Sequence, residues 1–220
     1  MKTLAIVSRK GGAGKTTLAA HLAVAAEMHG LATAVFDLDP QASVTLWADH
    51  RGEQFPAVVA AQAQRLPALL AQARQNEADL VILDTPPEAD AIAAEAAAQA
   101  DAILIPCRPS ALDLDAIGAS VRIARASGKP FYVVINAAPP QGVETDETHS
   151  AITGAGVELA PVVLHQRKAY ASRMHEGRTA QEIEPKGKAA AEIRDLLLWV
   201  CDKVIKIHLE QVIEVTRQRA

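Results

Sequence analysis

Short apolar runs alternate with longer amphipathic segments along the whole chain. The apolar runs predict β-strands near residues 2–8, 32–37, 56–60, 79–84, 101–106, 130–136 and 157–163. The segments between them space their apolar residues three or four apart and predict helices near 15–29, 41–50, 64–76, 89–99, 111–127, 144–153 and 187–217. Runs that are apolar at every position are typical of parallel strands buried on both faces. The alternation therefore predicts an α/β fold, doubly wound, with a mostly parallel sheet and helices on both faces.

Length and composition favour one domain. The chain has 220 residues, half of them hydrophobic, which is enough for a sizeable core. No linker or internal repeat divides it, so we expect a single domain over residues 1–220. Cys107 and Cys201 lack metal or redox spacing and predict reduced thiols in a cytoplasmic protein. Functional sequence starts at Lys2, which disfavours a signal peptide, and no apolar run is long enough to cross a membrane.

The first apolar run is followed by the glycine-rich segment KGGAGKTT, Lys10 to Thr17. It departs from the common phosphate-binding pattern G-x-x-x-x-G-K-[ST], because Arg9 occupies the position of the first glycine and Lys10 is an additional lysine. Such a loop points backbone N–H groups at an anion where a helix begins. The residues predicted to bind the nucleotide are Gly11, Gly12, Ala13, Gly14, Lys15, Thr16 and Thr17. Lys15 would reach the β- and γ-phosphates, and the Thr16 hydroxyl would bind Mg²⁺.

Two acidic motifs follow predicted strands. Asp37 and Asp39, in DLDPQ, lie on the same side of the chain, where they suit a metal and a water near the phosphates. Asp39 with the following proline is also good chemistry for a helix N-terminus. Asp84 ends the apolar run that begins at Leu80, as the aspartate that holds the Mg²⁺ shell does in nucleotide-binding loops of this kind. The Thr85-Pro86-Pro87 turn after it predicts a switch-like loop.

Together, KGGAGKTT and DLDPQ resemble the ParA/MinD family of deviant Walker A ATPases, and most closely its small ParA-type partition ATPases. The resemblance implies that Lys10 reaches across a nucleotide-sandwich dimer to the partner's phosphates. It implies that Asp39 positions or polarises the attacking water, and that Asp37 lies near Mg²⁺ through water. Lys10, Lys15 and Asp39 are thus the expected catalytic residues, and Thr16, Asp37 and Asp84 the expected metal site.

Later segments extend the resemblance. Residues 105–110 resemble the family's loop into a dimer-facing helix, whose N-terminus Asp113 and Asp115 would favour. Asn136 ends a predicted strand where family members contact the adenine, although it also suits a turn before Pro139. The segment 161–167 would border the base as well.

A local basic cluster stands out in a chain of net charge −4. Residues 165–178 contain four cations, two histidines and one acid, Glu176. The four cations are Arg167, Lys168, Arg173 and Arg178. The cluster reads either as a solvated loop and helix face or as a patch for non-specific DNA, with extensions at Lys186, Lys188 and Arg194. The resemblance favours DNA, because family members contact it through basic residues in their C-terminal part.

The resemblance implies an ATPase that uses ATP and Mg²⁺, forms a homodimer on ATP binding, binds non-specific DNA on the nucleoid and hydrolyses ATP when a ParB-like partner stimulates it. Its cycle would move plasmids or chromosomes. The alternatives are a MinD-like membrane-associated regulator and a positioning ATPase for another cargo. A metabolic enzyme is disfavoured, since no substrate-binding insertion is visible. The segment 187–217 mixes acidic and basic residues, which favours helix packing or oligomer contact over membrane binding.

Overall fold

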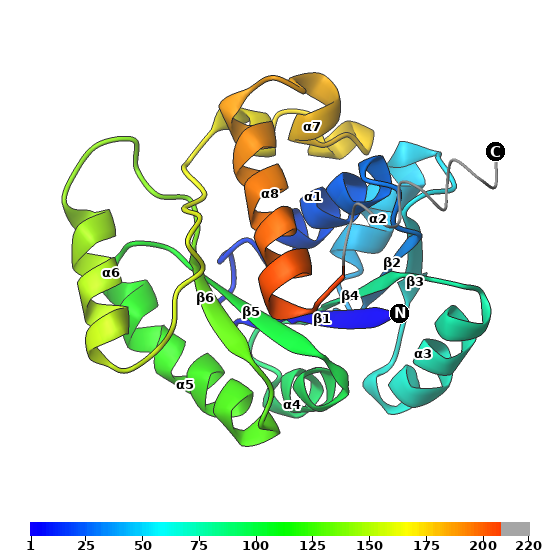
Figure 1. Cartoon of the computed structure of the whole chain (residues 1–220), viewed down its shortest axis with the longest axis horizontal. Helices are drawn as coiled ribbons and strands as arrows, with labels where there is room; N and C mark the ends of the chain where they lie inside the picture. The colour runs from blue at the N-terminus through cyan, green and yellow to red at the C-terminus, as the bar shows by residue number, and fades with distance from the viewer. Residues whose placement is uncertain (208–220) are drawn as a thin grey trace.

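The computed structural model describes residues 1–207, and these contain one parallel β-sheet of six strands (Figure 1). The strands are β1 Lys2–Ile6, β2 Thr33–Asp37, β3 Ala57–Ala60, β4 Leu80–Asp84, β5 Ala102–Cys107 and β6 Phe131–Ile135. Their order is β3-β2-β4-β1-β5-β6, and every neighbouring pair is parallel. The predicted α/β class and parallel sheet are confirmed.

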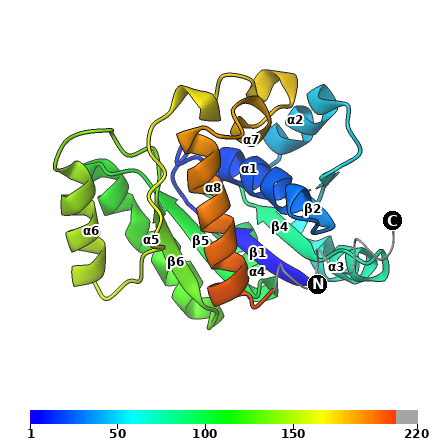
Figure 2. The same ribbon diagram turned by 45° about the horizontal axis from the view of Figure 1, so that its top comes forward.

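Helices cover both faces of this sheet (Figures 1 and 2). The helices are α1 Lys15–Met28, α2 Ser43–Arg51, α3 Leu66–Gln75, α4 Asp90–Gln99, α5 Ala111–Ser127, α6 Glu144–Gly154, α7 Ala180–Ile183 and α8 Lys188–Trp199. Short 3₁₀ turns occur at Ala63–Arg65, Lys168–Tyr170 and Met174–Glu176. The core has two layers: α1, α2 and α8 pack on one face, and α3, α4 and α5 on the other. The fold is therefore doubly wound, as predicted.

Alternation along each strand explains why the apolar runs are continuous. In β1, Leu4 and Ile6 join the cluster under α1 and α8, whereas Ala5 joins the cluster under α3, α4 and α5. In β4, Leu80 and Ile82 face the first cluster, and Val81 and Leu83 the second. A strand with helices on both sides needs an apolar residue at every position. These runs bury the strands in the middle of the molecule, and the polar residues therefore lie at the ends of the strands.

The predicted strand at 157–163 is wrong. That segment makes an isolated bridge between Leu159 and Val133 of β6, and a second bridge follows between His165 and Ala138. Pro161 has no N–H to donate to a ladder, so regular pairing stops there. The segment instead runs beside β6 as a loop and leads toward the basic cluster.

The predicted helix 187–217 is also wrong in extent. Helix α8 ends at Trp199 and continues as a π-helical turn, Val200–Val204, in which the N–H of Ile205 donates to the carbonyl of Val200. Lys206 then takes a left-handed φ of 58°, which terminates helical geometry. The rest of that prediction, residues 208–220, lies outside the described residues. Within residues 1–207, no helix combines the length and apolarity needed to span a bilayer.

Candidate functional site

The carboxyl ends of β1, β2 and β4 bring the three sequence motifs to one edge of the sheet. Asp84 of β4 is in register with Ile6 of β1 on one side and with Asp37 of β2 on the other. The glycine-rich loop leaves β1 at this edge and enters α1 at Lys15. Ligands of open α/β sheets bind at this edge, so the motifs meet where chemistry is expected.

The turn into α1 requires glycine at position 14. Gly14 is the N-cap of α1 with φ 93°, in the left-handed region. A Cβ built there would lie 2.3 Å from Nδ2 of Asn136, so a side chain meets both strain and a clash. No side chain caps this end of α1, which leaves its first N–H groups to an anion at the positive end of the helix dipole.

Lys15 lies inside the loop. Its side chain folds back so that Nζ donates to the carbonyl of Ser8 at 2.8 Å and, more weakly, to that of Lys10 at 3.4 Å. Burial lowers the pKa of Lys15, while the negative charges of Asp84 and Asp39 act in the opposite direction. A partly desolvated ammonium whose neighbours are loop carbonyls is suited to a phosphate.

Thr16 and Asp84 form the second part of the site. The Thr16 hydroxyl donates to Oδ2 of Asp84 at 2.7 Å. The other oxygen, Oδ1, is buried without a hydrogen-bond partner in the described part of the chain. Burial raises the pKa of Asp84 to about 7, so this carboxylate is costly to charge as it stands. An orphaned carboxylate oxygen beside a hydroxyl fits a hard divalent cation.

Mg²⁺ needs few protein ligands, because it keeps waters and binds the phosphates of its nucleotide. The described residues accordingly hold no group of three or more His, Cys, Asp or Glu side chains that would enclose a metal by themselves. Thr16 and Asp84 are the residues that would hold Mg²⁺, which when bound offsets negative charge on the phosphates. The arrangement therefore fits a magnesium nucleotide.

Asp37 and Asp39 shape the loop after β2. The buried Asp37 accepts from the backbone N–H of Asp39 at 3.1 Å and from Thr45, through its N–H at 3.0 Å and its hydroxyl at 2.8 Å. Asp39 is half-buried and accepts from the N–H of Gln41 at 2.9 Å. Asp37, rather than Asp39, is thus the acid that bonds into the first turn of α2. The metal role of Asp37 and the water role of Asp39 stay predictions.

Lys10 points away from the loop interior, toward α5 of its own chain. Its Nζ lies 2.9 Å from Oδ2 of Asp113, whose side chain is 8% exposed. Ser110, the N-cap of α5, accepts from the N–H of Asp113 and donates its hydroxyl to the same carboxylate. The expected place of Asp113 at this helix N-terminus is confirmed, and the structure adds its ion pair with Lys10.

Asn136 and part of the segment 161–167 line the same cavity beside the glycine-rich loop. Nδ2 of Asn136 donates to the carbonyl of Ala13 at 2.7 Å, so its side chain serves the glycine-rich loop rather than the Pro139 turn. A cavity of about 190 Å³ opens beside it, lined by Thr17 and by residues 164–167. Adenine binding there stays a prediction.

Sequence reasoning missed two polar groups near this cavity, the buried His21 and the half-buried Glu192. His21 of α1 is fully buried, with Nδ1 2.8 Å from the carbonyl of Thr17 and Nε2 accepting from the N–H of Ala180. No periodic signal marks His21, because it stands in an apolar helix. The α7 end did have a signal: Thr179 and Glu182 form a capping box with the S/T-x-x-E spacing.

The second missed group is Glu192 of α8. It accepts from Nε of Arg167 at 3.0 Å, from the Tyr170 hydroxyl at 2.9 Å and from the backbone N–H of His165 at 3.2 Å, and its Oε1 is 2.8 Å from Nδ1 of His165. Burial would raise the pKa of Glu192, but these hydrogen bonds hold it below its usual range. Glu192 therefore adds a second acid to Glu176 beside the basic cluster, from outside residues 165–178.

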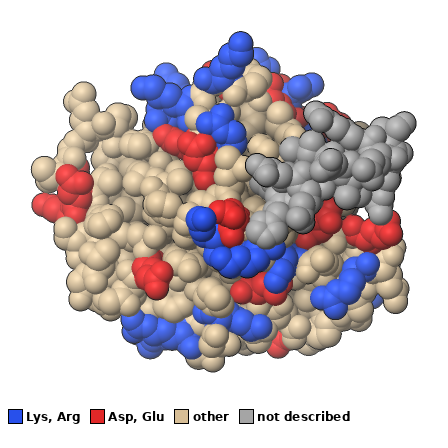
Figure 3. All heavy atoms as spheres, in the orientation of Figure 1, with Lys and Arg blue, Asp and Glu red and all other residues tan. Residues whose placement is uncertain are grey.

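The basic cluster is partly neutralised. Arg167 pairs with Glu192, and Arg173 pairs with Glu176. Lys168 and Arg178 are exposed and have no ion pair within residues 1–207. Figure 3 shows Lys and Arg gathered at the top of the view, over α7 and the start of α8. The exposed cations of this surface are Lys168, Arg178, Lys186 and Lys188.

Known proteins share both the sequence pattern and the fold of this chain. A family model described as the CobQ/CobB/MinD/ParA nucleotide binding domain matches residues 4–180. The maintenance of carboxysome distribution protein A of Halothiobacillus neapolitanus is 29% identical over 204 residues, which cover 89% of this chain and 94% of that protein.

Solved structures share the fold at low sequence identity. The septum site-determining protein MinD of Pyrococcus horikoshii, complexed with Mg-ADP, has a TM-score of 0.74 and 22% identity, covering 94% of this chain and 98% of its own. A putative plasmid partition protein of Borrelia burgdorferi, bound to AMPPNP, has a TM-score of 0.71 and 17% identity, covering 92% and 99%. The predicted ligands, ATP or ADP with Mg²⁺, agree with these complexes and with the residues of the loop.

Proposed function

Because the chain belongs to the CobQ/CobB/MinD/ParA nucleotide-binding family, we propose that it is a ParA-type positioning ATPase. It binds ATP with Mg²⁺, pairs as a homodimer and hydrolyses ATP to ADP and phosphate. The proposal rests on two facts: the family binds nucleotides, and Lys10 lies beside the phosphate loop. The position of Lys10 is the observation that supports pairing.

Lys10 supports pairing because its ammonium lies beside the loop interior, which Lys15 occupies, and not within it. It borders a groove of about 570 Å³ that is also lined by Leu112, Asp115 and Arg122 of α5. Leu112 is 73% exposed at this rim, an unusual position for a large apolar side chain unless a second surface covers it. In the proposed dimer, Lys10 leaves Asp113 and reaches the phosphates bound by the other chain.

Hydrolysis in this dimer is an in-line attack of water on the γ-phosphate. Lys15 of one chain and Lys10 of the other stabilise negative charge that develops on the phosphates. Asp39 orients the water, from the loop that Asp37 ties to α2. The Thr85-Pro86-Pro87 loop is tethered by the Thr85 hydroxyl, which donates to the carbonyl of Ile6 at 2.9 Å. This tether connects the loop to the strand that carries the phosphate site.

In the proposed function, the ATP-bound dimer binds DNA while it positions its cargo. The exposed Lys168, Arg178, Lys186 and Lys188 supply a sequence-independent contact with phosphates on the nucleoid. A ParB-like partner stimulates hydrolysis and releases the dimer. Plasmid or chromosome segregation is the first candidate cargo. A protein body is the second, favoured by the carboxysome-distribution relative, which is similar along nearly its whole length.

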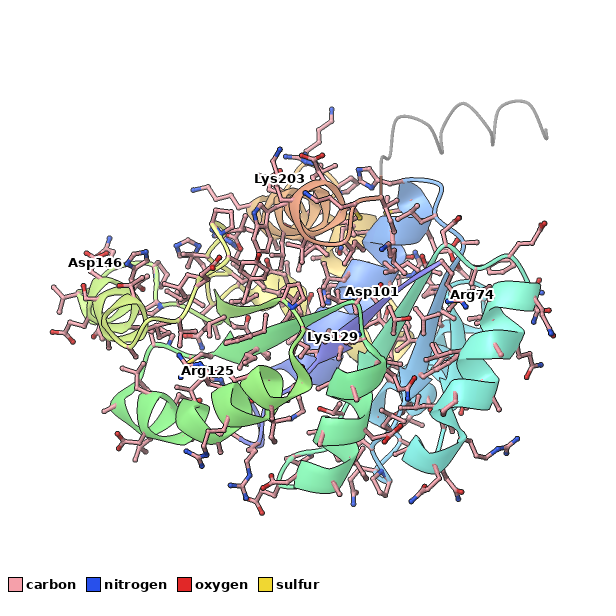
Figure 4. The ribbon with its side chains drawn as sticks, turned by 60° about the horizontal axis from the view of Figure 1, so that its bottom comes forward. Arg74, Asp101, Arg125, Lys129, Asp146 and Lys203 are labelled. Carbon is pink, nitrogen blue, oxygen red and sulfur yellow. The ribbon has the colours of Figure 1, made fainter. Side chains whose placement is uncertain are left out.

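DNA binding is tested with the double variant Lys168→Ala/Arg178→Ala in the presence of ATP and Mg²⁺. Arg74→Ala/Lys129→Ala is the matched control. Figure 4 shows Arg74 on α3 and Lys129 after α5, on the side away from α8. The slope of log affinity against log salt should fall by about 0.9 for each phosphate that the variant no longer neutralises. DNA binding equal to that of the control double variant would contradict the assignment.

Cargo is tested separately with the neighbouring DNA-binding or body-associated protein. A partner that binds a centromere-like site and accelerates ATP hydrolysis supports segregation. A partner that resides on a protein body and accelerates hydrolysis supports the second candidate.

A further inference from the structure

Arg108 stands between β5 and α5 in a constrained segment. Pro106 and Pro109 flank it, and its backbone carbonyl accepts from the N–H of Ser110 at 2.8 Å. Proline fixes φ, so this short connection has little freedom to swing. The Arg108 side chain is exposed. Its starting point is therefore fixed while its guanidinium remains accessible to a ligand.

The guanidinium of Arg108 lies over the glycine-rich loop. A Cβ built on Gly12 would be 3.6 Å from one terminal nitrogen of Arg108 and 4.0 Å from its central carbon. Arg108 also lines the cavity that Gly14 and Thr17 border. The loop therefore has two cationic side chains near it on this side: Lys15 inside the curl and Arg108 across Gly12.

Arg108 has no anionic partner in the described part of the chain. Five other arginines lie within 4.0 Å of a carboxylate: Arg9, Arg51, Arg167, Arg173 and Arg194. The backbone of Arg108 is constrained by prolines, and its side chain lies across an anion-binding loop. The N–H donors of its guanidinium are free of any carboxylate. A planar guanidinium of this kind matches the oxygens of a phosphate.

We propose that Arg108 binds the phosphate chain of the nucleotide held by its own glycine-rich loop. The proposal deepens the function proposed above and rests on it. Lys15 acts as a point charge within the loop, and Arg108 adds a second, directional set of donors from the end of β5. Arg108 thereby ties the connection that leads into α5 to the occupancy of the nucleotide site.

The test is equilibrium binding of Mg-ADP and of adenosine to wild type, Arg108→Ala, Arg108→Lys and the control Arg74→Ala. ADP is used because pairing is proposed to need ATP, so the titration reports a single chain. A charged hydrogen-bonding group that contacts phosphate predicts an ADP affinity loss of about tenfold to a hundredfold in Arg108→Ala. Arg108→Lys should recover part of it. The affinity for adenosine, and both affinities of Arg74→Ala, should match wild type.

Three results would overturn this role. Arg108→Ala that binds ADP as tightly as wild type rules out the phosphate contact and leaves the proposed function intact. An equal loss for ADP and adenosine places Arg108 at the nucleoside or in the fold, not at the phosphates. Failure of wild type itself to bind ADP would instead overturn the proposed function along with Arg108. Thermal unfolding of Arg108→Ala, an exposed position, checks that the variant is folded.

Discussion

The buried His21 makes the stability of the protein depend on pH between about 6.5 and 4. One ring nitrogen of His21 contacts the Thr17 carbonyl of α1, and the other accepts from the Ala180 N–H at the start of α7, so both nitrogens have partners. The N–H of Ala180 needs an acceptor at Nε2, and protonation of the ring removes it. Replacing His21 by glutamine should therefore change how stability responds to acid.

Burial lowers the pKa of His21 from 6.5 to about 4. The unfolded chain binds a proton as pH falls below 6.5, whereas the folded chain does not until pH approaches 4. Stability from neutral His21 is therefore full above pH 6.5 and is lost between pH 6.5 and 4. A shift of this size corresponds to about 3 kcal/mol.

The assay is urea unfolding of wild type and His21→Gln at several pH values from 7.5 down to 4. Wild type should lose about 3 kcal/mol more than His21→Gln over this range, because glutamine does not titrate. His29→Gln is the control, since His29 makes the same i−4 contact, Nδ1 to the carbonyl of Ala25 at 2.8 Å, from a half-buried position.

Parallel stability curves for wild type and His21→Gln would refute the reasoning. They would mean that folded and unfolded chains bind the same proton, and that burial of His21 does not keep it neutral. If His29→Gln lost less stability in acid than wild type while His21→Gln behaved as wild type, the pH dependence would belong to His29.

Two further predictions follow from single contacts. Gly14→Ala should abolish nucleotide binding, because its Cβ would lie 2.3 Å from Asn136. Gly11→Ala should fold normally, since nothing lies within 4 Å of a Cβ built there. ADP titration and thermal unfolding compare the two variants, and equal ADP affinities would contradict the prediction. Glu192→Gln should lower the unfolding free energy by about 1–3 kcal/mol, because Arg167 loses its half-buried charged partner. Glu184→Gln, at an exposed position, is the control in urea unfolding. Equal losses of unfolding free energy in the two variants would contradict a stabilising role of the contacts to Glu192.

The sheet and the phosphate site could be predicted because each rests on a local signal. An apolar run such as Leu80–Leu83 is typical of a strand covered on both faces, and Asp84 then falls at its carboxyl end. KGGAGKTT fixes its own turn, because Gly14 must take a left-handed φ. These signals lie within a few residues of what they specify.

The failures involve contacts between distant segments. Glu192 neutralises Arg167 from 25 residues away, so the charge of the basic cluster was overestimated from local composition. Arg108 and Gly12 meet through the pairing of β1 with β5, which spacing along the chain does not encode. The strand at 157–163 failed for a local reason: Pro161 has no N–H for a ladder.

The central claim, that Lys10 joins ATP binding to pairing, is tested most directly by the molar mass of the complex with Mg-AMPPNP, measured by light scattering for wild type and Lys10→Ala. Wild type should have the mass of two chains with the nucleotide and of one chain with ADP. Lys10→Ala should bind the nucleotide through Lys15 and keep the mass of one chain. Lys10→Ala dimers as tight as those of wild type would contradict the claim.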